Sequence, residues 1–146
     1  MKKAVFLLCL MAWLQEGCSG SRPENLGVVD GRLAPCPDTP NCVSTLSNDP
    51  AHRMEPMRYT GSDTAAMEKL AAVISRSQRA RILSRTDNYI HAEYVSRIWR
   101  FADDVELYLD NATGTIHFRS ASRMGYSDLG VNRRRMEAIR RAFTRK

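Results

Sequence analysis

The stretch Asp104–Ser122, DVELYLDNATGTIHFRSAS, alternates apolar and polar residues on both sides of the short segment NATG. A period of two places successive side chains on opposite faces of a strand. One face contains Val105, Leu107, Leu109, Ile116, Phe118 and Ser120. The opposite face contains Glu106, Tyr108, His117 and Arg119. With NATG as a hairpin turn, the stretch predicts two antiparallel strands that cover a core on one side only.

Two further strands are predicted upstream, over residues 80–86 and 89–101, with Asp87-Asn88 as the turn between them. The residues of the second strand that we expect to face the core are Ile90, Ala92, Tyr94 and Ile98. Glu93 and Arg97 then lie on the polar face, where cross-strand ion pairs are the simplest interpretation. Short turns between four successive strands imply an antiparallel meander.

A helix is predicted on each side of this meander. Asp63 is expected to cap the first one, and Asn132 the second. The apolar positions at helical spacing are Ala66, Met67, Leu70, Ala71 and Ile74 in the first helix, and Met136, Ile139 and Phe143 in the second. The sequence therefore predicts an α+β domain, a four-stranded antiparallel meander with both helices packed on one face.

The N-terminus has the pattern of an export signal. Lys2 and Lys3 precede the apolar run Ala4–Leu14, which is about half as long as a membrane-spanning helix. We interpret residues 1–17 as a signal peptide and Cys18 as the lipidated first residue of a bacterial lipoprotein. A lipobox usually has Leu where this chain has Gln15, so a plain secreted protein is the alternative.

This interpretation predicts a location and a domain organisation. The protein would face the periplasm from a membrane of the bacterial envelope, and Ser19 favours the outer membrane. Residues 18–34 are mixed Gly, Ser, Pro and charged residues, typical of a flexible tether. One domain would then occupy residues 35–146.

Two cysteines stand near the expected start of the domain, in PCPDTPNC. In an oxidising compartment Cys36 and Cys42 are expected to form a structural disulfide. A zinc site is the sharper alternative, but the three histidines lack paired ligand spacing. A redox-active pair is weaker still, because the two-residue spacing is absent. We expect no metal and no cofactor.

Basic residues are concentrated at the C-terminal end. Residues 119–146 contain nine Arg or Lys and two Asp or Glu. We hypothesise an anion-binding site formed by Arg119, Arg123, Asn132 and Arg133, in a loop ordered by Asp128, Ser120 and Ser122. Asp128 or the pair Asp103-Asp104 could instead neutralise these arginines internally. A third possibility is that the helix begins at Asp128, which places the arginines within it.

Two classes of function remain open. The first is a non-enzymatic module that binds a protein partner or an anionic lipid, lipopolysaccharide or cell-wall polymer; an exported protein meets little nucleic acid. The second is a small hydrolase or transferase that uses Glu93, Glu106 or His117 beside the arginines. The polar cluster on the sheet face that would serve it comprises Glu93, Arg97, Asp103, Asp104, Glu106 and His117. Because no nucleophile–base motif is present, the sequence favours the first class.

Three blocks, PCPDTPNCVS, HAEYVSRIWRFADDVEL and RSASRMGYSDLGVNRRRME, resemble the bacterial and plastid family called domain of unknown function 1499, from Leu26 onward. The resemblance implies an envelope or organelle location, often with a lipoprotein signal, and carries no agreed activity. The residues that match its motifs are Cys36, Cys42, Glu93, Asp103, Asp104, Glu106, Arg119, Ser120, Ser122, Arg123, Asp128, Asn132 and Arg133.

Overall fold

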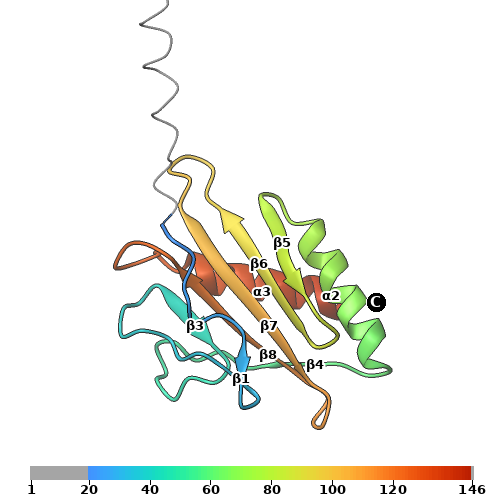
Figure 1. The fold of residues 1–146 in the computed structure, drawn as a ribbon. Coiled ribbons are helices and arrows are strands. Elements are labelled where there is room, and N and C mark those ends of the chain that lie inside the picture. The colour runs from blue at the N-terminus through green and yellow to red at the C-terminus, as the bar shows by residue number, and fades with distance from the viewer. Residues whose placement is uncertain (1–19, 146) are drawn as a thin grey trace, which may run out of the picture.

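The computed structural model describes residues 20–145, so the predicted signal peptide and Cys18 lie outside the described residues. Four consecutive strands form the centre of the fold: β5 (Ala80–Arg85), β6 (Tyr89–Val95), β7 (Ala102–Asp110) and β8 (Thr115–Ser122). Each strand pairs antiparallel with the next one along the chain. The predicted meander is therefore present in the middle of the sheet (Figure 1).

The sheet is larger than predicted, because two short strands also pair with β8. In β3 (Cys42–Ser44), Val43 lies opposite Ser120, and in β4 (Met57–Arg58), Met57 lies opposite Ile116. The sheet thus has six strands, in the order β3-β8-β7-β6-β5 with β4 also on β8. The prediction of four strands is wrong on this point, because a strand of two or three residues is too short to show an alternating pattern.

Both helices, α2 (Asp63–Ser75) and α3 (Val131–Thr144), lie on one face of the sheet (Figure 1). Every apolar position predicted for them is buried: Ala66, Met67, Leu70, Ala71, Ile74, Met136, Ile139 and Phe143. They pack against the apolar sheet residues Ile90, Ala92, Val105, Leu107, Leu109, Ile116 and Phe118. The predicted α+β class is confirmed, and the alternation in β7 and β8 correctly identifies the core face.

The cap of α2 is Ser62 and not Asp63. The Ser62 hydroxyl accepts a hydrogen bond from the amide of Ala65 at 3.2 Å, and Asp63 is the first helical residue. An acidic residue in the first turn of a helix is favoured by the helix dipole, so Asp63 still stabilises the helix start.

The cap predicted for α3 is wrong as well. Gly130, with φ of 77°, precedes the helix, and Asn132 is the second helical residue. The carboxylate of Asp128 accepts hydrogen bonds from the amides of Gly130 at 2.8 Å and of Asn132 at 2.7 Å. Asp128 therefore takes the capping role from outside the helix, which leaves the side chain of Asn132 free to bond elsewhere.

The segment after β6 is a loop, so the expectation that Ile98 faces the core is wrong. Strand β6 ends at Val95, and β7 begins at Ala102. The amide of Ser96 donates to the carbonyl of Phe101, and the Ser96 hydroxyl accepts from the Phe101 amide, each at 2.8 Å. These two bonds close a turn, which directs Ile98 into solvent.

A separate two-stranded hairpin lies on the polar face of the sheet, opposite the helices (Figure 1). It consists of β1 (Val28–Val29) and β2 (Arg32–Leu33), joined by Asp30 and Gly31 with φ of 49° and 70°. Residue contacts connect β2 to both β7 and β8, and Leu33 is buried. Residues 28–33, which we expected to belong to a flexible tether, are thus ordered on the sheet, and we call residues 27–36 the N-terminal layer.

The predicted disulfide between Cys36 and Cys42 is present, with an S–S distance of 2.02 Å. Cys42 is the first residue of β3, so the bond attaches the end of the N-terminal layer to an edge strand of the sheet. Within residues 20–145, no helix combines the length and apolar character needed to span a membrane.

Replacing both cysteines, Cys36→Ala/Cys42→Ala, should lower the melting temperature by about 5–10 °C, because so short a closed loop contributes about 2 kcal/mol. The effect should be largest in the N-terminal layer. Hydrogen exchange measured by mass spectrometry should therefore speed up in residues 27–33 more than in β7. Unchanged melting and unchanged exchange in this segment would contradict the role given to the disulfide.

Candidate functional site

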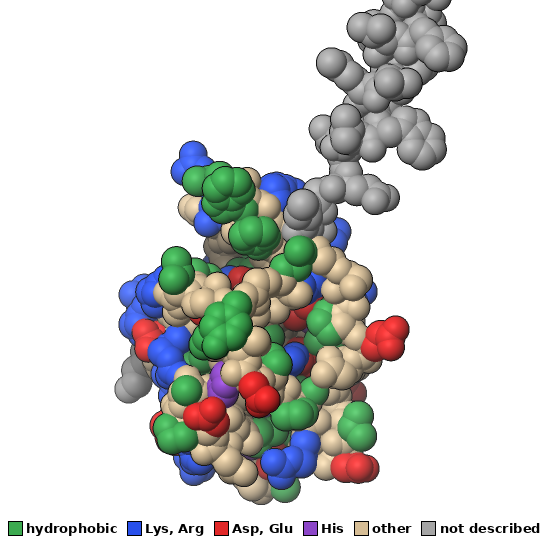
Figure 2. Space-filling model, turned by 90° about the vertical axis from the view of Figure 1, so that its left-hand side faces the viewer, with side chains coloured by type: hydrophobic (Ala, Val, Ile, Leu, Met, Phe, Trp, Pro, Cys, Tyr) green, Lys and Arg blue, Asp and Glu red, His purple; other side chains and the backbone are tan. Residues whose placement is uncertain are grey.

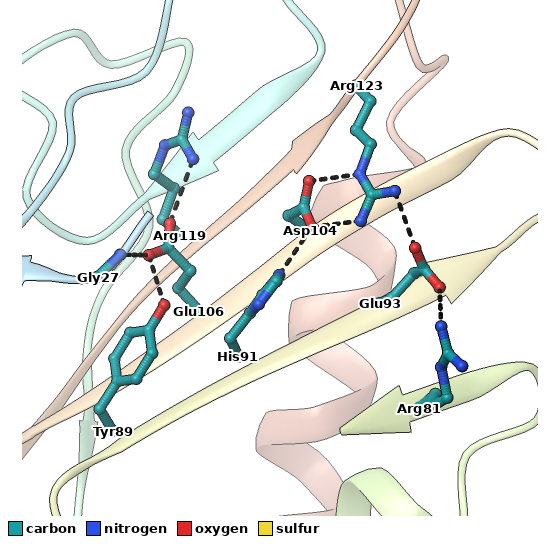
Figure 3. Close-up of polar contacts among 9 residues, drawn as sticks. All are labelled: Gly27, Arg81, Tyr89, His91, Glu93, Asp104, Glu106, Arg119 and Arg123. Atoms are coloured by element: carbon teal, nitrogen blue, oxygen red, sulfur yellow. Dashed lines mark hydrogen bonds and ion pairs between the residues drawn. The ribbon is translucent and has the colours of Figure 1, made fainter. Parts of the chain in front are cut away.

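The candidate site is a cluster of ionisable side chains on the polar face of β6, β7 and β8. Alternation along the strands brings Tyr89, His91, Glu93, Asp104, Glu106 and Arg119 to this face, opposite the helices. Figure 3 shows two groups of contacts side by side, one centred on Glu106 and one on Asp104. The two centres are two residues apart on β7, so they share one face of one strand.

Glu106 has no exposed surface and accepts three hydrogen bonds. Oε1 accepts from the amide of Gly27 at 2.8 Å and from the hydroxyl of Tyr89 at 2.9 Å, and Oε2 accepts from Nη1 of Arg119 at 3.2 Å. Gly27 directly precedes β1, so the N-terminal layer itself supplies a hydrogen-bond donor to this carboxylate. Burial raises the pKa of Tyr89, and the charge of Glu106 raises it further, so the hydroxyl remains a donor.

Asp104 is 1% exposed and forms the second centre. Nε and Nη2 of Arg123 each donate to it at 2.8 Å, a bidentate contact, and Nε2 of His91 lies 2.7 Å from Oδ1. Burial acts to raise the pKa of Asp104, but the bonds and charges of Arg123 and His91 outweigh burial and lower it from 3.8 to about 2. The carboxylate is therefore ionised throughout the physiological range.

Arg123 also joins a second carboxylate to this centre. Its Nη1 lies 2.8 Å from Oε2 of Glu93, while Nη2 of Arg81 donates to Oε1 of the same Glu93 at 3.2 Å. The alternation of cations and carboxylates therefore extends from β8 to β5 across the sheet (Figure 3). Such a chain holds its members in fixed positions, since each carboxylate has two partners.

Arg119 is the one member with an incomplete set of partners. Its Nε is buried and has no hydrogen-bond partner among the residues that the structure describes. The guanidinium is otherwise held by Glu106, and both side chains are removed from solvent. Removing either side chain of such a buried ion pair leaves the other charge buried without a partner, which destabilises the folded state.

The four residues predicted to bind an anion together are divided between the two faces of the sheet. Arg119 and Arg123 contact carboxylates on the polar face. Asn132 is fully buried on the helix side, where it bonds to Ser120, Ser122 and the carbonyl of Asn41. Arg133 donates to two backbone carbonyls, those of Ala51 and Arg53. Each predicted group thus already has a partner within the described chain.

Of the carboxylates considered as internal partners, Asp103 and Asp104 contact arginines. Nη2 of Arg135 donates to Asp103 at 2.5 Å on the helix side, and Asp104 binds Arg123 on the other. Asp128 orders the loop before α3, as expected, through the amide bonds described above. Among these arginines, Asp104 pairs with Arg123 and Asp103 with Arg135, whereas Arg119 pairs with Glu106 and Arg133 contacts only backbone carbonyls.

Three members of the expected polar cluster lie outside it, and one of them is Asp103, which binds Arg135 on the helix side. Arg97 is exposed in the loop after β6, because that strand ends early. His117 faces Thr45, with Nδ1 3.2 Å from its hydroxyl oxygen, and burial lowers the pKa of this histidine. Conversely, sequence reasoning missed Tyr89, His91 and Gly27. A tyrosine, a single histidine or a glycine carries no sequence signal that it contacts a buried acid.

The cluster contains acids and a histidine, and its two central acids have no free access to solvent. A general base requires a free lone pair within reach of a substrate. Glu106 and Asp104 are sealed from solvent, and each is bound to an arginine. Within residues 20–145, no group of three or more His, Cys, Asp or Glu side chains is close enough to hold a metal ion.

The Arg119→Met substitution should destabilise the protein by about 3–5 kcal/mol, because it leaves Glu106 charged, buried and without its cation. In a double-mutant cycle with Glu106→Met, measured by urea unfolding, the two effects should fall short of additivity by about 1–3 kcal/mol. An additive cycle would show that the pair is not coupled.

Lowering the pH should decrease the free energy of unfolding, because Asp104 becomes protonated. Because the folded pKa of about 2 lies below the usual 3.8, the contribution of this group is complete above about pH 4 and is lost as the pH falls towards 2. The difference in unfolding free energy between wild type and Asp104→Asn should therefore shrink by about 2 kcal/mol between pH 6 and pH 2. A difference that stays constant would contradict the ion pair. Asp38→Asn, at an exposed position, is the control and should change stability at pH 6 by less than about 0.5 kcal/mol.

Comparison with known proteins places the chain in a family. The model of the family described as "Protein of unknown function (DUF1499)" matches residues 32–143, from β2 to the last turn of α3. No curated protein and no solved structure matches the chain. The match covers the sheet, both helices and the ionisable cluster, and the chain belongs to this family of unknown function.

Proposed function

We propose that the chain is an exported lipoprotein of the bacterial envelope, anchored by lipid on Cys18, facing the periplasm and favouring the outer membrane. Its domain is a non-enzymatic module that binds an anionic envelope component. The signal-like first 17 residues and Gly17-Cys18 support the anchor. The Cys36–Cys42 disulfide is consistent with an oxidising compartment.

The observation that carries the non-enzymatic part is the burial of the two central acids, Asp104 and Glu106. The N-terminal layer donates the Gly27 amide to Glu106, so a substrate has access to this carboxylate only if that contact opens. The alternative, a small hydrolase or transferase that uses carboxylates of the sheet face, requires such an opening. The binding module requires none and is the function that the geometry supports better.

We propose an anionic ligand because two exposed arginines have no acidic partner within the described part of the domain. Arg97 and Arg100 are exposed, and neither pairs with an acid among the residues that the structure describes. Arginine suits phosphate groups because its guanidinium donates in a fixed, planar geometry. Anionic lipid is thus the leading ligand of the proposal, ahead of lipopolysaccharide, cell-wall polymer or a protein partner.

The Cys18→Ala substitution should abolish incorporation of a fatty-acid probe and move the protein from the membrane to the soluble fraction, because one sulfur carries the anchor. Cys9→Ala is the matched control, since Cys9 lies within the apolar run, and it should leave the label and the fractionation unchanged. Wild-type protein that is exported, soluble and unlabelled would overturn the lipoprotein proposal.

A further inference from the structure

Two loops lie side by side at one end of the sheet. The first connects β6 to β7 over residues 96–101, and the second connects β8 to α3 over residues 123–130. The amide of Arg123, at the start of the second loop, donates to the carbonyl of Ala102, directly after the first. The bases of the two loops therefore adjoin; in Figure 1 the first loop lies at the top of the sheet and the second extends to the left below it.

These loops expose large apolar side chains to an unusual degree. Ile98 is 77% exposed, Trp99 71% and Leu129 83%. Among the described residues, eight large apolar side chains are exposed: Val29, Ile98, Trp99, Phe101, Met124, Tyr126, Leu129 and Val131. All except Val29 belong to the two loops or directly follow the second. Such a concentration on one end of a domain marks a contact surface.

The described chain begins at this same end. A Cβ atom built on Gly20 would lie 2.9 Å from Cγ of Met124, so the backbone of Gly20 is in contact with the second loop. Cys18 stands two residues before Gly20 in the sequence, and two residues of chain span at most about 7 Å. Any lipid on Cys18 would therefore enter a bilayer next to the exposed apolar side chains.

Basic residues flank the apolar ones. In the sequence Arg97-Ile98-Trp99-Arg100-Phe101, arginines stand on both sides of the two most exposed apolar side chains of the loop. Figure 2 shows hydrophobic and basic side chains together at the top of the molecule. Tryptophan and tyrosine prefer the interface between lipid and water, and arginine is attracted to anionic headgroups.

We propose that these two loops form a membrane-docking surface, consisting of Arg97–Phe101 and Met124–Leu129, which inserts its apolar side chains at the headgroup level of an anionic bilayer. The proposal deepens the proposed function and rests on the lipid anchor for its orientation. The occupant is lipid because the chain that carries the anchor leaves the domain at this surface, within reach of the bilayer. The ionisable face then lies along the side of a domain that stands on the membrane.

The sequence provides its own probe, since Trp99 is the only tryptophan besides Trp13. With Trp13→Phe in every variant, the full-length gene is expressed and the labelled protein is reconstituted in vesicles of phosphatidylethanolamine and phosphatidylglycerol. Lipids brominated near the headgroup should quench most of the Trp99 fluorescence of the vesicle-bound protein. Acrylamide in the aqueous phase should quench this fluorescence less than it quenches Trp99 of the Cys18→Ala protein, measured in solution without detergent. The Arg97→Glu/Arg100→Glu variant should show less quenching by brominated lipid and more quenching by acrylamide, because the new glutamates are repelled by the anionic headgroups.

The matched control carries the tryptophan at the other end of the sheet, in Trp99→Phe/Ala112→Trp. Ala112 is exposed in the turn between β7 and β8, so this tryptophan should respond to acrylamide and not to brominated lipid. Melting temperatures near that of wild type establish that each variant is folded.

The outcomes separate the two proposals. Protein that is labelled and floats with vesicles, but whose Trp99 responds as the control does, overturns the docking surface and leaves the anchor in place. Protein that is neither labelled nor vesicle-bound overturns the proposed function, and the docking surface with it. Protection of Trp99 in cells but not in vesicles of these lipids also overturns membrane docking, in favour of a protein partner.

Discussion

The buried pairing of Glu106 with Arg119 is the constraint on which the rest of the structure depends. A carboxylate with no exposed surface is tolerated only if cations and donors surround it. Glu106 therefore needs the guanidinium, the hydroxyl of Tyr89 and the amide of Gly27, which come from two neighbouring strands and from the N-terminal layer. One acid thus connects three parts of the chain, and Asp104 connects a further set beside it.

This requirement explains the layered architecture. The helices bury the apolar face of the sheet, and the β1–β2 hairpin covers the polar face. Gly31 allows the tight turn of the hairpin, because its φ of 70° is a conformation that other residues rarely adopt. The disulfide then holds the hairpin at β3. The segment that would lead to a lipid anchor is consequently part of the folded domain, and the domain has a defined orientation relative to it.

Local patterns in the sequence predicted the elements that repeat over many residues. The period of two in β7 and β8, the helical spacing in α2 and α3, and the pairing of Cys36 with Cys42 were each predicted correctly. Strands β3 and β4 escaped prediction, because two or three residues carry no period. The site was predicted only in part. Asp104 and Glu106 were recognised as polar-face acids, but their partners depend on strand register and on the fold of residues 27–33, which no local pattern encodes.

The most direct test of this account is the hydrogen exchange of the Gly27 amide, followed by NMR in the native protein. If the N-terminal layer seals the buried acids, this amide exchanges only when the layer opens, and its protection approaches that of core amides in β7. The Glu106→Gln variant should lose much of this protection, because a neutral amide oxygen is a weaker acceptor than a carboxylate. Exchange of Gly27 at the rate of a free peptide in the wild type would contradict the account, since it would show that residues 20–34 are a tether after all.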